Sequence, residues 1–479
     1  ALTQEVAYDS MLVERRRQIH EITAAALEEM FADSLDDHLG ELAHHYSRSA
    51  NVTKAVHYLK LAGQQAGRRS AYQDALDYLK NATDLVPRLP PSRDRDLLEL
   101  ELRVAHGALF TAVRAFAMPE MEPSIRRVEE LCEQLGDSSV TLSGLFGLWS
   151  LNLARARLDE ALRMATRLVE IAAPLHDPVA LGSAHSAMGG TSVWLGKFRQ
   201  AREHLEQTVA IFDRDVAQFL PLQGAPVIPA HCQLAWALWM LGHPTEANSV
   251  MARALALADQ LKRPFSTAFA LLYSVALDDF RRDYRSIGPK IDALDEISRE
   301  NGFASWMDSA TLSLGRARIF AGDPHGGLEM MTNALGGLRE HGAEMIRTYS
   351  LTLVADSCLA TDQIEHGLDV IEQAFESFDA TGVRLPEAEA YRLKGELLLR
   401  RGRAESDAAG AFRRAIEVAR MQDAKSWELR AAISLARLLS REGQPDEARL
   451  ALSPVYQWFP EGLDTPDLLE GAALLRSLA

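Results

Sequence analysis

The chain repeats itself about every 40 residues, a period typical of helical-hairpin arrays. Four short segments that read as turns each begin with a glycine, and they span residues 196–201, 242–247, 322–327 and 443–448. A helical hairpin cannot bury its apolar face alone, so successive hairpins must stack on one another. The repeat therefore predicts one long stack of hairpins. The curved surface of such a stack usually functions in binding another molecule.

The residues between these turns have helical spacing. Apolar side chains of residues 161–172 recur at the period of one helix face, and Gly or Ala recurs where two helices must approach closely. We expect an all-α fold, a right-handed superhelical solenoid of tetratricopeptide-like hairpins. Its repeats of about 40 residues are longer than the usual 34 or so. Ten anchor positions mark the hairpins: Ala55, Ala75, Ala161, Ala201, Ala247, Ile287, Gly327, Gly367, Ala408 and Ala448. The gap from Ala75 to Ala161 has room for one more, degenerate hairpin, interrupted by Pro119 and Pro123.

Composition agrees with closely packed helices, because 47% of residues are hydrophobic and only 7% are aromatic. A formal net charge of -16 opposes nonspecific binding to nucleic acid or to an anionic membrane. The three cysteines are far apart and odd in number, which disfavours a disulfide framework or a zinc site. No apolar run is long enough for a membrane span and no signal peptide is evident. We expect a cytoplasmic protein without metal or cofactor.

Two stretches interrupt the repeat. Residues 87–91 are proline-rich and read as a linker. Residues 213–229 carry three prolines among apolar residues, where a polar loop would be usual. This apolar loop either packs back on the array or forms a lid over the concave face.

Both ends of the chain resemble one protein family. The runs ALTQEVAY (1–8), ERRRQIH (14–20), LAHHY (42–46) and SAYQDALDYL (70–79), with residues 452–475, are similar to the C-terminal region of large bacterial signalling proteins. Those proteins join a class III adenylate or guanylate cyclase, or a DNA-binding domain, to a STAND or AAA-type ATPase and then to a tetratricopeptide-like tail.

The resemblance implies four segments. Residues 1–50 would end an upstream helical or winged-helix module, residues 51–90 the first hairpins, residues 91–451 the solenoid and residues 452–479 a C-terminal cap. It also implies that Ala1 marks a cut inside a longer protein.

No residues in the chain match the family's catalytic parts. The phosphate-binding loop G-x-x-x-x-G-K-[ST] is absent, and the paired glycines at 189–190, 326–327 and 336–337 lack the following Lys-Ser/Thr. The acidic residues lie on polar helix faces, without the pattern of a cyclase site. We expect no catalysis by this chain, and its parent to be an ATPase or a nucleotide cyclase.

Three polar clusters invite a chemical interpretation. Glu41 and His44 are three residues apart, a spacing that metal sites use, with His45 beside them, but no second pair completes a di-metal site. His185 lies between two serines without an acid to orient it, so a helix contact is favoured over a nucleophile. Short basic runs at 15–17 and 400–403 are more typical of helix ends and ion pairs than of DNA contacts.

The repeat also predicts which side chains line the concave face. The first helix of each tetratricopeptide unit faces inward at fixed offsets. From the positions at these offsets we take six as candidate binding residues: Trp236, Trp239, Arg316, Tyr349, Asp356 and Arg392. The two tryptophans share a helix face beside the apolar loop, so they stack on a ligand or anchor that loop. The arginines suit peptide carboxylates, although interhelix ion pairs explain most arginines of this kind.

Two functions remain open. The first is a scaffold that docks a protein segment, or its own upstream ATPase or cyclase domain, on the concave face. The second is a small-molecule sensor, by likeness to the superhelical domain of the maltose-regulon activator, which controls an attached module. An aromatic pocket at Trp236 and Trp239 would favour the sensor, and a long charged groove the scaffold.

Overall fold

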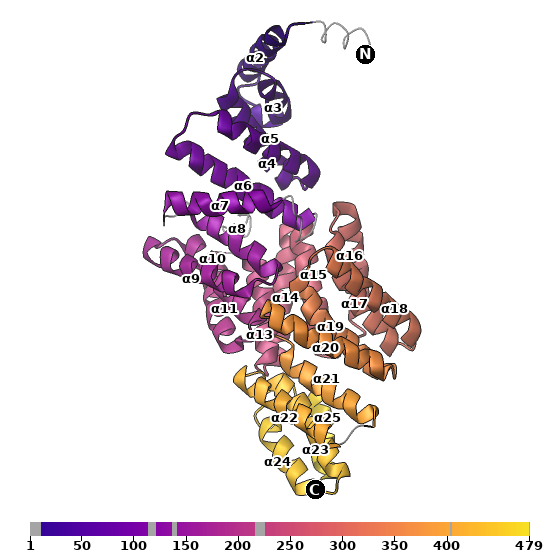
Figure 1. Ribbon diagram of the computed structural model, residues 1–479. Helices are drawn as coiled ribbons and strands as arrows, with labels where there is room; N and C mark the ends of the chain where they lie inside the picture. Colours follow the sequence, from indigo (N-terminus) through magenta and orange to yellow (C-terminus); the bar gives the residue numbers. More distant parts are fainter. Residues whose placement is uncertain (1–10, 114–120, 137–140, 216–225, 403–404, 479) are drawn as a thin grey trace. The chain divides into compact units, whose positions relative to one another are not determined.

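The structure, a computed structural model, describes residues 11–113, 121–136, 141–215, 226–402 and 405–478 (Figure 1). These residues form 23 α-helices and no strand. The predicted all-α class and the stack of helical hairpins are confirmed.

The described residues form two compact units that divide inside helix α8 (Thr141–Ala154). Residues up to Leu148 belong to unit 1, and residues from Trp149 onward belong to unit 2. The division of the chain into four segments, predicted from the resemblance, stays a prediction.

Unit 1 begins with a long helix, α2, followed by shorter helices that pack in pairs. Its core is made by the apolar faces of α3 and α4, where Leu42 and Tyr46 meet Ala55 and Leu59, all almost fully buried. The helices are α2 (Val13–Met30), α3 (Leu39–Ser47), α4 (Val52–Arg68), α5 (Tyr72–Leu85), α6 (Arg93–Val113), α7 (Glu122–Leu135) and the first part of α8.

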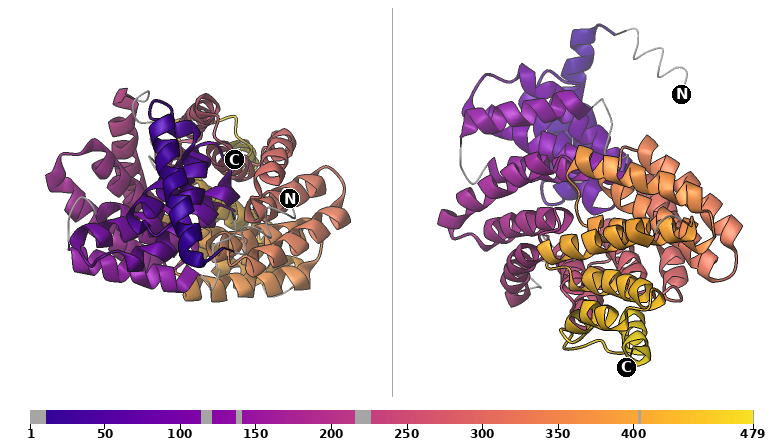
Figure 2. Two further views of the ribbon diagram at one scale, coloured as in Figure 1. Left: turned by 90° about the horizontal axis from the view of Figure 1, so that it is seen from above. Right: turned by 60° about the horizontal axis from the view of Figure 1, so that its bottom comes forward.

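Unit 2 is the array of hairpins. In Figure 2 the hairpins from residue 344 onward, coloured orange to yellow, follow one another as successive layers. Their helices are α9 (Leu158–Ala172), α10 (Pro178–Trp194), α11 (Phe198–Phe212), α13 (Val227–Met240), α14 (Pro244–Leu261), α15 (Pro264–Phe280), α16 (Ile287–Asn301), α17 (Ala304–Phe320), α18 (Pro324–Glu340), α19 (Glu344–Ala360), α20 (Ile364–Thr381), α21 (Glu387–Arg400), α22 (Glu405–Met421), α23 (Lys425–Arg441), α24 (Pro445–Tyr456) and α25 (Pro466–Ser477).

Local sequence explains where these helices start and stop. Asp323 caps α18, because its carboxylate accepts a hydrogen bond from the amide of Gly326 at 3.0 Å. The tight turns inside hairpins need a left-handed residue, which Gly242 and Gly322 supply with φ of 88° and 100°. All ten predicted anchor positions are buried. Helices α6 and α7 fill the gap where a degenerate hairpin was expected, whereas Pro119 lies outside the described residues.

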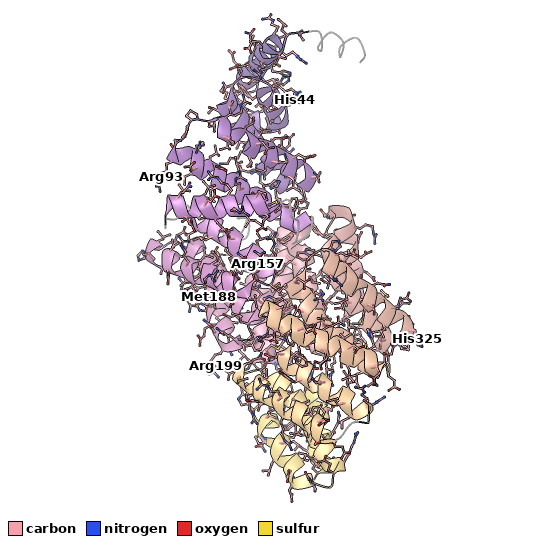
Figure 3. All side chains as sticks on the ribbon, viewed as in Figure 1. His44, Arg93, Arg157, Met188, Arg199 and His325 are labelled. Atoms are coloured by element: carbon pink, nitrogen blue, oxygen red, sulfur yellow. The ribbon has the colours of Figure 1, made fainter. Side chains whose placement is uncertain are left out.

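The last hairpins of unit 2 contact its first ones. The amide of Arg384 donates to the carbonyl of Trp194 at 2.8 Å, and Arg199, labelled in Figure 3, pairs with Asp423 at 2.9 Å. Glu461, in the loop between α24 and α25, accepts hydrogen bonds from the first amides of α14 at 3.0 and 3.1 Å. Unit 2 is therefore closed on itself by residues far apart in sequence.

None of the helices in the described residues combines the length and the hydrophobicity that crossing a membrane requires. The cysteines Cys132, Cys232 and Cys358 are all buried and free of disulfides.

Candidate functional site

The first helices of six successive hairpins form an inner row in unit 2. Each of α13, α15, α17, α19, α21 and α23 contacts the next one in this row, and α23 also contacts α13. The repeat turns the same face of each first helix inward, so side chains from distant hairpins meet at the centre. We call this group of side chains the inner core.

One part of the inner core is aromatic. Trp236 stacks on Tyr273 with ring centroids 4.3 Å apart, and its indole N–H donates to the carbonyl of Tyr273 at 2.9 Å. Trp239 stacks on Phe280 at 5.1 Å and meets the edge of Trp427 at 4.9 Å. Both predicted tryptophans are at most 4% exposed and pack against neighbouring helices.

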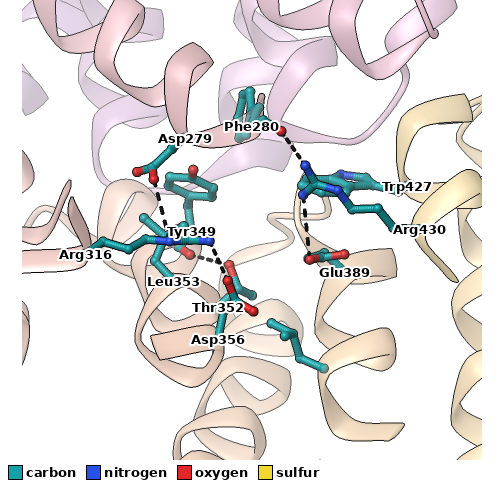
Figure 4. Close-up of a pocket in the computed structure, with 11 residues that line it drawn as sticks. Asp279, Phe280, Arg316, Tyr349, Thr352, Leu353, Asp356, Glu389, Trp427 and Arg430 are labelled. Atoms are coloured by element: carbon teal, nitrogen blue, oxygen red, sulfur yellow. Dashed lines mark hydrogen bonds and ion pairs between the residues drawn. The ribbon is translucent and has the colours of Figure 1, made fainter. Parts of the chain in front are cut away.

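The other part of the inner core is a chain of ion pairs. Arg316 of α17 bonds Asp356 of α19 and lies 3.6 Å from Asp279 of α15. Arg392 of α21 is held by Glu389 through two hydrogen bonds of 2.8 and 2.7 Å and lies 3.8 Å from Asp356. Consecutive hairpins are thus linked by alternating charges, and Figure 4 shows the pairs that Arg316 makes with Asp279 and Asp356.

Arg430 of α23 connects this chain to the opposite side of the inner row. Its guanidinium donates to the carbonyl of Phe280 and to Asp467 at 2.8 Å. It lies over the ring of Trp427, 4.9 Å from the centroid, and 3.8 Å from Glu389. A planar guanidinium both stacks and donates in several directions, which a lysine cannot do.

The surroundings change the acidity of the carboxylates. Burial raises the pKa of Asp279 to about 6, against the opposing effect of Arg316. Burial also acts on Asp356, but the guanidinium groups of Arg316, Arg392 and other arginines outweigh it and hold the pKa of Asp356 below its ordinary value.

The inner core leaves a small cavity between α15, α17, α19, α21 and α23 (Figure 4). Its volume is about 20 Å³, room for about one water molecule. Among the described residues, Tyr349 Oη and Trp427 Nε1 of its lining are buried without a hydrogen-bond partner, whereas Asp279 Oδ1 and Arg316 Nε make no hydrogen bond but lie 3.6 Å apart as an ion pair. A buried polar group without a partner is costly, so such atoms are unusual in a purely structural core.

All six residues predicted for the concave face lie in the inner core, and Arg316, Tyr349 and Asp356 line the cavity. The structure brings them together, and among the described residues they contact one another or neighbouring side chains of the inner core. Their role in binding a partner or ligand stays a prediction. Residues 216–225, most of the apolar loop, lie outside the described residues.

Sequence reasoning missed several members of the inner core: Asp279, Phe280, Trp427, Arg430 and Asp467. The repeat contains a signal for two of them, Trp427 and Arg430. Glu396 and Ser434, which share a hydrogen bond, are 38 residues apart, and the same shift carries Glu389 to Trp427 and Arg392 to Arg430. Asp279 and Phe280 lie in α15, where the repeat is eroded, and Asp467 lies beyond the last complete hairpin.

The three other polar clusters make local contacts. His45 Nδ1 lies 2.9 Å from Nδ1 of His20, and Arg48 bonds His44 at 2.7 Å. No group of three or more potential metal ligands is placed for a metal ion among the described residues. His185 Nδ1 lies 2.8 Å from Nδ1 of His204, which is a contact between two helices.

The basic runs contain ion pairs. Arg17 lies 3.8 Å from Glu14, and Arg400 lies 2.7 Å from Asp362. Arg401 pairs with Glu365 at 2.8 Å, whereas Arg403 lies outside the described residues.

No family model matches the chain. An uncharacterized protein of Rhizobium meliloti is 23% identical over 446 residues, which cover 91% of this chain and 43% of that protein. The chain thus spans less than half the length of this curated relative.

Among solved structures, the fold is similar to a Rap protein complexed with Competence and Sporulation Factor, with a TM-score of 0.59 and 14% identity over 77% of this chain and 98% of that one. It is also similar to the Cut9–Hcn1 assembly of the APC/C, with a TM-score of 0.53 and 12% identity over 100% of this chain and 85% of that one. These likenesses establish a tetratricopeptide-like fold.

Proposed function

We propose that this chain is a non-catalytic regulatory scaffold that holds a protein segment against the inner row of unit 2. The segment belongs to a partner protein or to the chain's own parent, a bacterial signalling ATPase or nucleotide cyclase. The observation that carries the proposal is the inner core itself, where charged and aromatic side chains of six hairpins meet around a small cavity, at which Tyr349 Oη and Trp427 Nε1 have no hydrogen-bond partner among the described residues.

A protein segment needs far more room than the cavity offers, so the structure corresponds to the resting state of such a scaffold. In an array, each hairpin contacts only its neighbours, and small rotations add up along the stack. Opening would separate α23 from α13 and α15, where Arg430 bonds the Phe280 carbonyl and Ser426 bonds the Trp239 carbonyl at 2.5 Å. A segment with acidic and aromatic side chains would then replace the contacts that Arg316, Arg392 and Trp239 make internally.

The comparisons support a place in a larger protein. The Rhizobium meliloti relative is more than twice as long as the matched region. One similar structure is a Rap protein complexed with a factor, and another is an assembly of two proteins, Cut9 and Hcn1. We extend to this chain the ability to bind another protein, and not the identity of those partners.

Hydrogen exchange tests the scaffold directly. The chain is mixed with the remaining part of its parent protein, and amide exchange is compared with and without that part. We expect changes in α17, α19 and α21, the helices that carry the inner core. A footprint confined to the outer helices α18, α20 and α22 would contradict binding at the inner row.

A pair of variants tests whether unit 2 must open before the segment binds. Arg282→Ala removes an ion pair of 3.0 Å with Glu470 that helps to close unit 2, so binding at the inner row should strengthen. Arg163→Ala is the matched control, because the exposed Arg163 pairs within its own helix α9, with Glu160 at 3.4 Å. Equal binding by both variants would contradict an opening step.

The sensor is the second candidate, favoured by Tyr349 Oη and Trp427 Nε1, two buried atoms at the cavity without a hydrogen-bond partner among the described residues. A small polar ligand that satisfies them would stabilise unit 2 in a thermal-shift screen of metabolites. The shift should weaken in Tyr349→Phe, which removes one of these atoms but keeps the ring. No shift with any metabolite at millimolar concentration would exclude the sensor.

A further inference from the structure

Helix α2 has an exposed apolar face on the side away from its own core. Its buried residues are His20 and Ala24, which face α3. Five large hydrophobic residues of the segment are exposed: Leu12, Val13, Ile19, Ile22 and Met30, with Ile22 66% and Met30 71% accessible. A single exposed apolar residue is ordinary, but such a concentration on one helix marks an interaction surface.

The exposed residues of α2 form a regular stripe. Arg15, Ile19, Ile22, Ala26 and Glu29 are all exposed and follow the alternating spacing of three and four residues. This is the spacing of the contact positions in a two-helix coiled coil. We call these five residues the α2 stripe.

The α2 stripe is complementary to itself when two helices run antiparallel. A register that sets Ile19 against Ile22 of the second copy also sets Ile22 against Ile19 and places Arg15 against the small Ala26. Such reciprocity is the requirement of a two-fold symmetric contact. The isoleucines then form the apolar centre of the pair.

The charges of the α2 stripe also favour an antiparallel arrangement of the two helices. Helical side chains lean toward their own N-terminus, so Arg15 would lean past Ala26 of the second copy toward its Glu29. Arg15 and Glu29 have no ion-pair partner among the described residues, and Arg15 makes only a long hydrogen bond of 3.4 Å with Gln18. A parallel pair would instead bring like charges together at each end.

We propose that the α2 stripe is a homodimerisation surface, on which the α2 of a second copy of this chain packs antiparallel. A contact of one short helix pair buries less than about 1,200 Å² in total, which is typical of weak complexes. The dimer is therefore expected to dissociate in the micromolar range. The proposal is independent of what unit 2 binds.

Sedimentation equilibrium of the whole chain, over a concentration series in the micromolar range, tests the proposal. Ile22→Glu places a charge in the apolar centre and should leave only monomer, while circular dichroism stays unchanged because the residue is exposed. Leu450→Glu, at a residue of α24 that is 75% exposed, is the matched control and should keep the wild-type equilibrium.

A charge exchange tests the direction of the helices. Arg15→Glu and Glu29→Arg should each weaken the dimer about tenfold, since each contact occurs twice and becomes repulsive. The double variant Arg15→Glu/Glu29→Arg should restore wild-type affinity, because the exchanged charges meet across the two copies. A monomer at every concentration, a dimer insensitive to Ile22→Glu, or a double variant that fails to recover would each overturn the proposal.

Discussion

Arg316 and Asp356 face each other across one repeat, with 40 residues between their positions in the chain. Arg316 lies on α17 and Asp356 lies on α19. Their bond therefore connects two neighbouring hairpins of the inner row. Arg392 extends the connection to α21 on the other side of Asp356. The carboxylate of Asp356 thus lies between the guanidinium groups of Arg316 and Arg392, and we expect the stability of the inner core to depend on it most.

We expect Asp356→Asn to destabilise unit 2 by about 3 kcal/mol. The substitution leaves Arg316 and Arg392 buried without their shared counter-charge, and the cost is at the low end for a buried pair because 22% of the Asp356 side chain is accessible. The measurement is urea unfolding followed by tryptophan fluorescence. Asp362→Asn, which loses a fully exposed pair with Arg400, should cost less than about 1 kcal/mol. Equal losses of unfolding free energy in the two variants would mean that the ion pairs of the inner core stabilise unit 2 no more than an exposed pair does.

The pair His185 and His204 predicts a loss of stability in acid. Their Nδ1 atoms lie 2.8 Å apart, so one nitrogen donates and the other accepts, and protonation of both rings breaks this contact. Burial lowers the pKa of both histidines. Because the folded pKa lies below the unfolded one, this stability is present above the unfolded value of about 6.5 and is lost as the pH falls through the folded value.

The test is the free energy of unfolding between about pH 7 and pH 5. The double variant His185→Gln/His204→Gln should show a flatter pH dependence than the wild type. His366→Gln, at an exposed position of α20, should keep the wild-type slope. A slope that survives the double variant would assign the acid sensitivity to other groups.

Two glycines in adjacent helices predict opposite effects of the same substitution. A Cβ on Gly315 would lie 2.6 Å from the carbonyl oxygen of Gly327, so Gly315→Ala forces α17 and α18 apart and should cost about 1–3 kcal/mol. A Cβ on Gly336, also in α18, would meet nothing within 4 Å. Gly336→Ala should therefore raise stability by up to about 1 kcal/mol through helix propensity. Thermal unfolding of both variants tests this prediction. A change in stability of the same sign in both would contradict the close approach of α17 and α18 at Gly315.

Glu461 closes unit 2 by capping a helix from another hairpin. Its carboxylate accepts from the amides of Thr245 and Glu246 at 3.0 and 3.1 Å, which have no partner within α14. Glu461→Ala should cost about 1 kcal/mol and accelerate hydrogen exchange at these two amides. Glu442→Ala, at an exposed position without such a contact, should change neither quantity. Unchanged exchange in the first variant would show that the cap is not maintained in solution.

Much of the fold follows from local patterns. Nine of the ten anchor positions are Gly or Ala, and these are predictable because a helix pair can approach closely only at small side chains; Ala201 and Ala247 are accordingly fully buried. Glycines such as Gly242 mark turns because only they adopt positive φ without strain. The same periodicity selected the inward face of α13, α17, α19 and α21, and so all six predicted residues of the inner core.

The closure of unit 2 had no local signal. The contacts of Arg430 with the Phe280 carbonyl and of Glu461 with α14 join residues 150 or more positions apart. They depend on the accumulated rotation between hairpins, to which every interface adds a little. A pattern within one repeat contains no information about that sum.

The amino-acid sequence by itself determined the helices, their pairing and the side of each first helix that turns inward, because spacing and residue size decide these within 40 residues. Only the tertiary structure decided what those inward side chains meet. It placed Arg316 and Arg392 beside Asp356 of a neighbouring hairpin and stacked Trp239 on Phe280 of another helix. The physical reason is that burial of a charge is tolerated only with a nearby partner, and Asp356, the carboxylate that Arg316 and Arg392 share, comes from a hairpin that the stacking alone brings to them.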